Sequence, residues 1–384
     1  MDAATQERLA ARIRDLRRGR TTDLGAATHR VPASDYTSDA VLAAEVRTLF
    51  LGGPLLAGLS GDARAPGDWF SFEACGRSAV VWRRGDGTLR AFVNACRHRG
   101  MRIATGHGHA DRLLVCPYHS WSYDADGRLQ SIPGAEGFAD VAREGLGLGR
   151  LQVHEAAGLV WVDFASDGAE HVDLGGADAE LVPFDLAAYH PVERRAHRFA
   201  ANWKLTIDSF LEAYHLHFLH VDSLRPMFHG NLALFDAFGR NGRVVGVRRS
   251  FDGRADGASL LPHVTVLYQL FPNAVLIHQQ DHVELYQSFP AGADPNACEV
   301  RVTLYAPAPP ATDAAREHWR RNLDLVDTVT STEDFAACEK IQSNLRAAAV
   351  PFVVVGRNEP GMAHFHRTLH AVLGLDAEGA VPCT

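Results

Sequence analysis

Helical and strand-like periodicities follow one another along this chain. Near its start, Leu9, Ile13 and Leu16 recur at helical spacing within a polar stretch, which predicts an amphipathic helix over residues 3 to about 20. A second short helix is expected over residues 39–50. Beyond it, short apolar runs separated by Gly, Pro and Asp predict β-strands at 69–72, 78–82 and 89–93.

Two Asp-Gly pairs mark tight turns in this strand-rich region. Asp86-Gly87 lies between two of the predicted strands, and the same dipeptide recurs at Asp126-Gly127, so each is a hairpin signal. The run at 159–162 is typical of a closing strand, and the polar stretch Ser166-Asp167-Gly168 follows it. We therefore expect a small all-β domain that ends near residue 170.

The second half of the chain has a helical segment followed by strands. Leu205, Phe210, Leu211, Leu216 and Leu219 favour a helix through residues 202–220. Further strands are expected at 264–268, 274–278 and 283–286. The expected organisation is a helical lead-in at residues 1–38, an all-β domain at 39–170 and a third, mixed domain at 171–384.

Length and charge narrow the possible functions. A chain of 384 residues exceeds one typical domain, and 46% apolar residues are enough for large cores. The net charge of -8, with acidic and basic residues interspersed, offers no basic stripe for nucleic acid. The sequence has neither an uninterrupted apolar stretch of about eighteen residues nor a signal-like start, so we expect a cytoplasmic protein without a membrane partner.

Two cysteines and two histidines form the most specific motif. Cys96 and His98 make one pair, and Cys116 and His119 follow after a gap of seventeen residues. This set suits a Rieske [2Fe–2S] centre, in which two thiolates hold one iron and two imidazoles the other. Structural zinc takes the same ligand types, but zinc fingers usually pair like with like, whereas each arm here is mixed. The motif therefore predicts electron transfer, with zinc as the alternative.

A second cluster of acids and imidazoles lies within the helix predicted for the second half. Asp208, Glu212, His215, His217 and His220 fall within thirteen residues, which suggests a metal site. Helical geometry leaves the ligands open, because His217 and His220 share a face better than His215 and His220, which are about 140° apart. The wider pair requires the helix to end or distort before His220. Polar residues on an exposed helix face are the simpler interpretation.

Together the two motifs resemble a known family. The pattern C-x-H-x17-C-x2-H, and Asn202-Trp203-Lys204 followed by Glu-x2-His-x4-His, are similar to the terminal oxygenase (α) component of the Rieske non-heme iron ring-hydroxylating oxygenases, from about Tyr36 to Leu373. The resemblance implies an α+β fold, with an N-terminal all-β Rieske domain and a C-terminal helix-grip (START-like) catalytic domain that has an antiparallel sheet. It also implies a [2Fe–2S] cluster and a mononuclear Fe(II) as cofactors.

The resemblance assigns the iron ligands by position. His215 and His220 match the family's iron-binding H-x4-H pair, which leaves His217 as a neighbour. Asp334 matches the third ligand, with Glu333 as the fallback. Two His and one carboxylate leave iron positions open for O2 beside a substrate.

Glu212 matches an acidic residue that, in the family, bridges a Rieske histidine of one subunit to an iron histidine of its neighbour. A carboxylate that accepts the outer N–H of both imidazoles would fix their tautomers and couple the two centres. The usual residue is Asp, and the family members associated with Glu act on quaternary ammonium compounds. A homotrimer follows from the resemblance alone, because such transfer requires neighbouring subunits.

The expected function is that of a terminal oxygenase that inserts oxygen from O2 into a small organic substrate. Aromatic hydroxylation, by a mono- or dioxygenase, is the first expectation. Monooxygenation of a quaternary ammonium compound, or oxidative demethylation of an N- or O-methylated one, is the second. No flavin or nicotinamide motif is present, so a separate NAD(P)H-dependent reductase, with or without a ferredoxin, must supply electrons. A Rieske electron carrier with a ligand-binding domain is the alternative from another class, and the intact set of His215, His220 and Asp334 argues against it.

Overall fold

The structure is a computed structural model, and it describes residues 1–165 and 172–375. The chain divides into two compact units. The smaller unit comprises Leu49–Val172 and Asp185–Tyr189, and the larger unit comprises Met1–Thr48, Asp173–Phe184 and His190–Thr384. The predicted link Ser166-Asp167-Gly168 lies outside the described residues, and the three-domain division made from the sequence stays a prediction.

The smaller unit is built on a seven-stranded antiparallel sheet with the order β2-β11-β10-β5-β4-β3-β6. Its strands are β2 (Pro54–Leu59), β3 (Asp68–Ala74), β4 (Arg77–Arg83), β5 (Leu89–Val93), β6 (His107–His109), β10 (Arg150–Ala156) and β11 (Leu159–Asp163). A separate three-stranded sheet contains β7 (Leu114–Val115), β8 (Ser122–Tyr123) and β9 (Leu129–Ser131). The predicted strands of this region are therefore confirmed.

Both predicted Asp-Gly hairpins are present. Gly87 joins β4 to β5 with a φ of 82°, and Gly127 joins β8 to β9 with a φ of 77°. At Gly127 a Cβ atom would also lie 2.5 Å from the ring of Phe92, so this turn needs glycine for both its backbone and its packing. The hairpins keep the loops between the strands short, and the loop that carries Cys96 starts directly after β5.

The larger unit contains a second seven-stranded antiparallel sheet, with the order β12-β18-β17-β16-β15-β14-β13. Its strands are β12 (His190–Phe199), β13 (Phe228–Phe238), β14 (Asn241–Arg248), β15 (Val264–Leu270), β16 (Ala274–His278), β17 (Val283–Pro290) and β18 (Cys298–Ala306). The three strands expected from the sequence correspond to β15, β16 and β17. A small ladder also pairs β1 (His29–Pro32) with β19 (Phe352–Val355).

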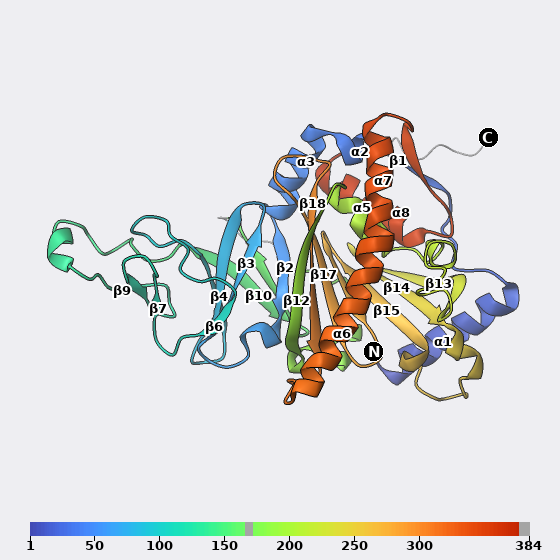
Figure 1. The fold of residues 1–384 in the computed structure, drawn as a ribbon, viewed down its shortest axis with the longest axis horizontal. Coiled ribbons are helices and arrows are strands. Elements are labelled where there is room, and N and C mark those ends of the chain that lie inside the picture. Colours follow the sequence, from blue (N-terminus) through green and yellow to red (C-terminus); the bar gives the residue numbers. More distant parts are fainter. Residues whose placement is uncertain (166–171, 376–384) are drawn as a thin grey trace. The chain divides into compact units, whose positions relative to one another are not determined.

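A long helix crosses one face of this sheet (Figure 1). It consists of α6 (Asp313–Val329), the π-helical turn η9 (Thr330–Asp334) and α7 (Phe335–Arg346). The other helices are α1 (Ala3–Gly19), α2 (Ser34–Thr37), α3 (Asp39–Glu45), which continues as the π turn η1 (Val46–Phe50), α4 (Asp178–Leu181), α5 (Trp203–Asp208) and α8 (Pro360–Leu373). Antiparallel sheet and enclosing helix confirm the expected α+β, helix-grip architecture. None of the helices within the described residues combines the length and the hydropathy that a membrane span needs.

The short helix α5 is buried along its whole length. Asn202 begins it, because the Asn202 side chain accepts a hydrogen bond from the Lys204 amide at 3.1 Å. The Lys204 ammonium is 2.5 Å from the Glu45 carboxylate, and both side chains are almost fully buried. The other Glu45 oxygen accepts from the Trp203 indole at 2.8 Å. These charge-assisted contacts fix the segment from which the predicted histidines follow.

Candidate functional site

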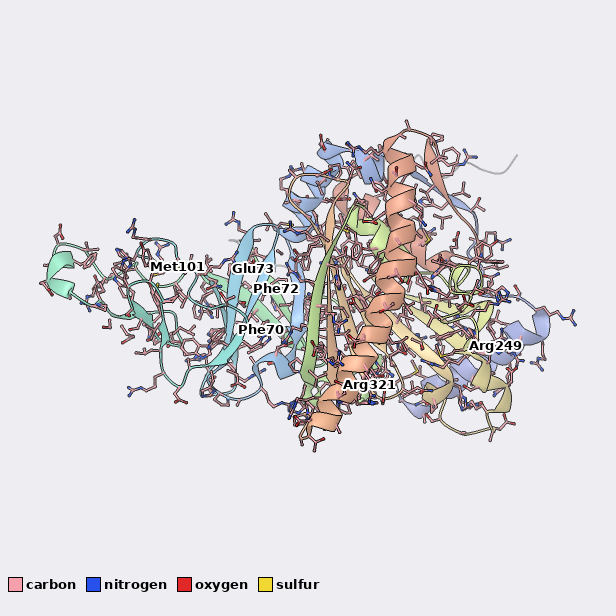
Figure 2. All side chains as sticks on the ribbon, in the orientation of Figure 1. Phe70, Phe72, Glu73, Met101, Arg249 and Arg321 are labelled. Carbon is pink, nitrogen blue, oxygen red and sulfur yellow. The ribbon has the colours of Figure 1, made fainter. Side chains whose placement is uncertain are left out.

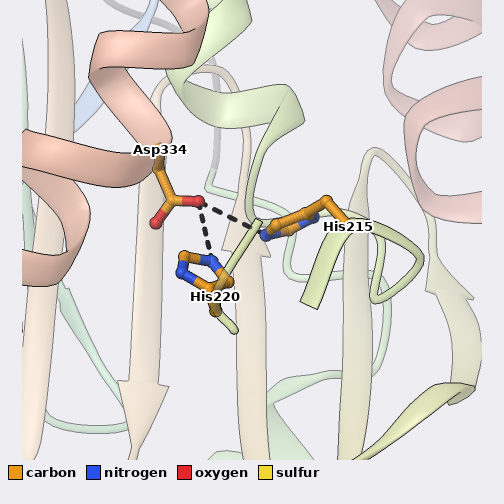
Figure 3. Close-up of side chains that lie close together, drawn as sticks. All are labelled: His215, His220 and Asp334. Carbon is orange, nitrogen blue, oxygen red and sulfur yellow. Dashed lines mark ion pairs between the residues drawn. The ribbon is translucent and has the colours of Figure 1, made fainter. Parts of the chain in front are cut away.

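Three side chains from two distant parts of the sequence converge in the larger unit (Figure 3). Asp334 Oδ1 lies 3.3 Å from His215 Nε2 and 3.0 Å from His220 Nε2. One ligand atom from each residue lies within 4.8 Å of the others, and no other group of three His, Cys, Asp or Glu residues in residues 1–165 and 172–375 does so. The geometry thus brings together the three residues that the resemblance assigned to iron.

The atoms that face one another in this triad suit a bound cation. His220 Nε2 and Asp334 Oδ1 are buried and make no hydrogen bond within the described part of the chain, although they lie 3.0 Å apart. A buried polar atom without a partner is costly, and a metal ion between these atoms would satisfy both. Burial raises the pKa of Asp334, but the two imidazoles outweigh burial and hold it below its ordinary value.

The helix predicted over 202–220 is wrong beyond Asp208. The backbone leaves α5 through tight turns, and a short 3-10 segment, η6 (His215–His217), follows. The carboxylate of Glu212 accepts hydrogen bonds from the Tyr214 and His215 amides, so a side chain replaces the carbonyls that a continuing helix would offer. This break is the distortion that the wider histidine pair requires.

A carboxylate orients each histidine of the triad. His215 Nδ1 donates to Glu212, and His220 Nδ1 donates to Glu333 Oε2 at 2.5 Å. Glu333 also accepts from Ser223 Oγ at 2.7 Å. Each imidazole therefore keeps its proton on Nδ1 and presents Nε2 to Asp334. Glu333, the alternative third ligand of the sequence prediction, lies outside the triad and holds the His220 ring in place. No sequence signal pointed to that role or to Ser223.

The remaining members of the predicted cluster lie elsewhere. Asp208 accepts hydrogen bonds from Tyr36 Oη at 2.9 Å and from His366 Nε2 at 2.9 Å, in a buried network. His217 belongs to η6 but not to the group of converging ligand atoms. Asp208 is therefore part of the packing that joins α5 to α8, and His217 is a neighbour of the triad.

The triad opens into a cavity of about 460 Å³. Its wall combines polar and apolar side chains, and most of the exposed wall surface is apolar; the apolar residues include Phe210, Met227, Phe228, Leu267, Ile277, Tyr286 and Val329. Tyr286, on β17, lines the cavity, whereas Tyr268, Phe271 and His278 on or beside the neighbouring strands do not. A cavity of this size with a mainly apolar wall surface suits a small organic ligand.

The Cys and His motif of the smaller unit forms two pairs. His98 Nδ1 lies 3.1 Å from His119 Nδ1 at the surface, whereas Cys96 and Cys116 are buried and their thiols interact. The Cys96 thiol also contacts the Tyr123 hydroxyl at 3.2 Å. A single tetrahedral zinc would hold all four ligand atoms within about 4 Å of one another. No three of these atoms meet that closely in the described structure, so the arrangement fits two irons better than one zinc.

Two protein-family models match this chain, and each matched segment contains one of the two candidate sites. Residues 55–143 match the family model described as "Rieske [2Fe-2S] domain". Residues 186–375 match the one described as "Ring hydroxylating alpha subunit (catalytic domain)". The two matched segments contain, respectively, the Cys and His pairs and the triad.

Several characterised proteins are similar in sequence. The glycine betaine monooxygenase oxygenase subunit of Pseudomonas aeruginosa is 30% identical over 198 residues, which is 51% of this chain and 46% of that protein. The chloroplastic choline monooxygenase of Spinacia oleracea is 27% identical over 362 residues, 90% of this chain and 78% of that protein. This chain thus spans about half the length of the first of these relatives.

Solved structures share the fold. The quaternary ammonium Rieske monooxygenase CntA, in complex with L-carnitine, superposes with a TM-score of 0.75 at 20% identity, covering 92% of this chain and 96% of that one. A naphthalene 1,2-dioxygenase with indole bound superposes with a TM-score of 0.70 at 21% identity, covering 90% and 92%. At these identities the likeness is one of fold.

Proposed function

Since this chain belongs to the alpha subunits of the Rieske ring-hydroxylating oxygenases, we propose that it is a terminal oxygenase that inserts oxygen from O2 into a small organic molecule. The observation that carries the proposal is the convergence of His215, His220 and Asp334 at the wall of a cavity, in a chain that also has paired Cys and His residues. A protein that only carries electrons would need neither a second metal site nor a cavity beside it.

The proposed ligands follow from the geometry of each site. Cys96 and Cys116 would hold one iron of a [2Fe–2S] cluster, and His98 and His119 the other. The triad would hold a mononuclear Fe(II). When bound, the cluster supplies single electrons and the mononuclear iron supplies open positions for O2 beside the substrate.

The residues around the triad have separate tasks. Glu212 and Glu333 hold the protons of both imidazoles on Nδ1, so that each Nε2 lone pair points into the site. Phe210 and Tyr286, whose ring centroids lie 4.8 Å apart, line the same cavity and give it an apolar surface. The two glutamates thus orient the histidines, and the two rings contribute to the wall that a substrate would contact.

For the substrate, we favour a quaternary ammonium or other N-methylated compound over an aromatic one. Related proteins act as glycine betaine and choline monooxygenases, and Glu212 stands where the family more often has Asp. The rings of Phe210, Phe228 and Tyr286 in the cavity wall offer faces on which a methylated cation can rest. Aromatic hydroxylation, the first expectation from sequence, becomes the second candidate, because the same apolar wall accepts an aromatic ring.

Electron delivery would cross between subunits of a homotrimer. Around Glu212 the larger unit exposes Tyr214 (47%), Phe218 (66%) and Val221 (45%), and on the smaller unit Tyr118 (55%) is exposed beside His119. The exposed apolar side chains near Glu212, and the exposed ring beside His119, support burial of each site against a neighbouring copy. An NAD(P)H-dependent reductase, with or without a ferredoxin, is the proposed source of electrons, and the cytoplasm is the proposed location because reduced nicotinamides are available there.

The metal content and oxygen consumption of the purified full chain test this proposal. We expect about three irons per chain, visible Rieske absorption, and O2 uptake that depends on a substrate when a reductase is supplied. Two irons without a mononuclear site would support the electron-carrier alternative. A protein with zinc, no iron and no visible absorption would contradict both.

Replacing Glu212 with Gln is expected to leave both metals bound but to slow product formation about ten- to a hundred-fold. The amide still accepts one hydrogen bond from His215, but it loses the charge and the second acceptor that would bridge to a neighbouring cluster. Iron content, Rieske absorption and turnover with the native reductase are the measurements. Glu317→Gln, at an exposed position of α6, is the control. Unchanged turnover of Glu212→Gln would contradict the proposal that Glu212 bridges the two metal sites.

A further inference from the structure

Arg248 is a partly buried arginine without an acidic partner in the described residues. It lines the same cavity as the triad, at the end of β14. No carboxylate lies within 4 Å of its guanidinium in the described residues. By contrast, carboxylates pair with the guanidinium groups of Arg83, Arg195, Arg243 and Arg254.

Only neutral groups hold the Arg248 side chain. One terminal nitrogen donates to Thr265 Oγ1 at 2.9 Å and to Gln279 Oε1 at 2.9 Å, and the guanidinium lies 5.0 Å from the centre of the Phe228 ring. Its Nε is buried and has no hydrogen-bond partner in the described part of the chain. Burial lowers the pKa of Arg248, and Glu284 only partly offsets this effect. An anion beside this partly buried cation would pair its charge and could accept from the unpaired Nε–H.

Arg248 lies on the face of β14 that lines the cavity, because side chains alternate between the two faces of a strand. Val244, Gly246 and Arg248 are alternate residues of β14, and all three line the cavity. Gly246 pairs with Thr265 across the ladder, so the guanidinium lies near this row of the sheet. Gly246 has no side chain, and the Phe228 ring, over which the guanidinium also lies, packs 3.7 Å from where a Cβ atom would stand.

The triad lies toward the other end of the same strands. Tyr286, whose ring contacts Phe210, lies level with Gly242 across the sheet. The strand pairing runs from Gly242 through Gln269 and Val275 to Tyr286. Gly242 is four residues from Gly246, about 13 Å at the rise of an extended strand. A ligand held at Arg248 would therefore extend along the cavity with its far end near Phe210 and Tyr286.

We propose that Arg248 binds a carboxylate of the substrate, so that this oxygenase acts on organic acids, zwitterions included, oxidised several bonds from the carboxylate. Two parallel N–H donors of a guanidinium match the two oxygens of a carboxylate, whereas an alcohol or a second cation leaves them unpaired. Glu284, buried on the neighbouring part of the wall with one unpartnered oxygen, disfavours a second negative charge there. The inference rests on the proposed oxygenase function for the fate of the bound acid, but not for its binding.

The test compares acids with their matched alcohols on the iron-loaded full chain under anaerobic conditions. The three pairs are glycine betaine and choline, 4-(trimethylammonio)butanoate and its alcohol, and benzoate and benzyl alcohol. Calorimetric titration gives each dissociation constant. We expect the acid to bind about ten- to a hundred-fold more tightly than its alcohol in at least one pair, the range of a charge-assisted hydrogen-bonded pair.

Variants at Arg248 identify the residue responsible. Arg248→Gln should abolish the preference for the acid without weakening the alcohol, and Arg248→Lys should restore part of it, because Lys keeps the charge but not the paired donors. Arg249→Gln is the matched control, since Arg249 is the next residue, is exposed and lies at the surface of the larger unit (Figure 2). Unchanged thermal unfolding of each variant establishes that it is folded.

Two results would overturn the inference: no acid binds the unsubstituted protein more tightly than its alcohol, or the preference persists in Arg248→Gln. Iron content and O2 uptake of the same samples separate the two proposals. Arg248-dependent acid binding without O2 uptake would leave the anion site standing and remove the oxygenase function. Oxygenase activity that is equal on acids and on their alcohols would support the oxygenase function and remove the anion site.

Discussion

Replacing Asp334 with Asn is expected to lower iron from about three to about two per chain and to reduce substrate-dependent O2 uptake more than a hundred-fold, beyond the effect typical of residues that only orient ligands. Asn lacks the charge that offsets the cation, and it leaves His215 and His220 as the only protein ligands. Rieske absorption should be unchanged, because the Cys and His pairs belong to the other compact unit. Iron analysis, visible spectra and oxygen-electrode rates measure the three quantities.

Glu333→Gln provides the comparison for Asp334→Asn. Glu333 holds His220 by its outer nitrogen, so its loss should weaken iron binding about ten- to a hundred-fold and leave binding at high iron concentration. Asp313→Asn, at an almost fully exposed carboxylate on the first turn of α6, should change neither metal. If Glu333→Gln lost the mononuclear iron while Asp334→Asn kept it, the assignment of the carboxylate ligand would be reversed.

The largest loss of stability is expected from Lys204→Met. The ammonium of Lys204 and the carboxylate of Glu45 are paired at side-chain exposures of 2% and 1%, so removing the cation leaves a buried, uncompensated charge. Breaking a pair of this kind costs about 3–5 kcal/mol in free energy of unfolding. Urea denaturation followed by tryptophan fluorescence measures the change in the midpoint.

A double variant separates charge from packing at this site. Glu45→Gln combined with Lys204→Met removes both charges and keeps an acceptor for the Trp203 indole, so most of the lost stability should return. Arg18→Met breaks a pair whose side chains are 79% and 67% exposed, and it should cost less than about 1 kcal/mol. A double variant as unstable as Lys204→Met alone would mean that shape, not charge, dominates.

Local chemistry accounts for what the sequence predicted well. Asp86-Gly87 and Asp126-Gly127 specify their hairpins because the turn itself needs a residue with positive φ, whatever surrounds it. The Cys and His pairs were identifiable because two thiols and two imidazoles at short spacing have few other uses. Neither inference depended on residues far away in the sequence.

The features that the sequence left open or predicted wrongly depend on contacts between residues far apart in the chain. The apolar spacing through 202–220 favoured a helix, but the Glu212 carboxylate takes the amides on which the helix would have continued. Arg248 showed no distinguishing signal among 38 basic residues, because its isolation from acids exists only in the folded sheet. The membership of residues 1–48 in the larger unit is likewise a property of contacts that no local pattern encodes.

The choice between Glu333 and Asp334 has a geometric explanation. His318, Asn322, Leu325 and Val329 line the cavity at intervals of four, three and four residues, as one face of α6 does. In a regular α-helix the next member of that face is residue 332 or 333. The π-helical turn Thr330–Asp334 adds a residue, which rotates Asp334 into the triad and leaves Glu333 at the side, where it meets His220.

Because of that extra residue, the side chains of α7 do not continue the same helix faces as those of α6. The face of α7 that follows it, with Phe335, Cys338, Gln342 and Leu345, is buried in the core, whereas the face of α6 before it forms a cavity wall. Larger or smaller side chains at Leu325, Val326 and Val329 would reshape the chamber without turning Asp334 away from its partners. The helix thus consists of two segments that can diversify independently: α6 can change with the molecule bound in the cavity, while the π turn and α7 keep Asp334 beside His215 and His220.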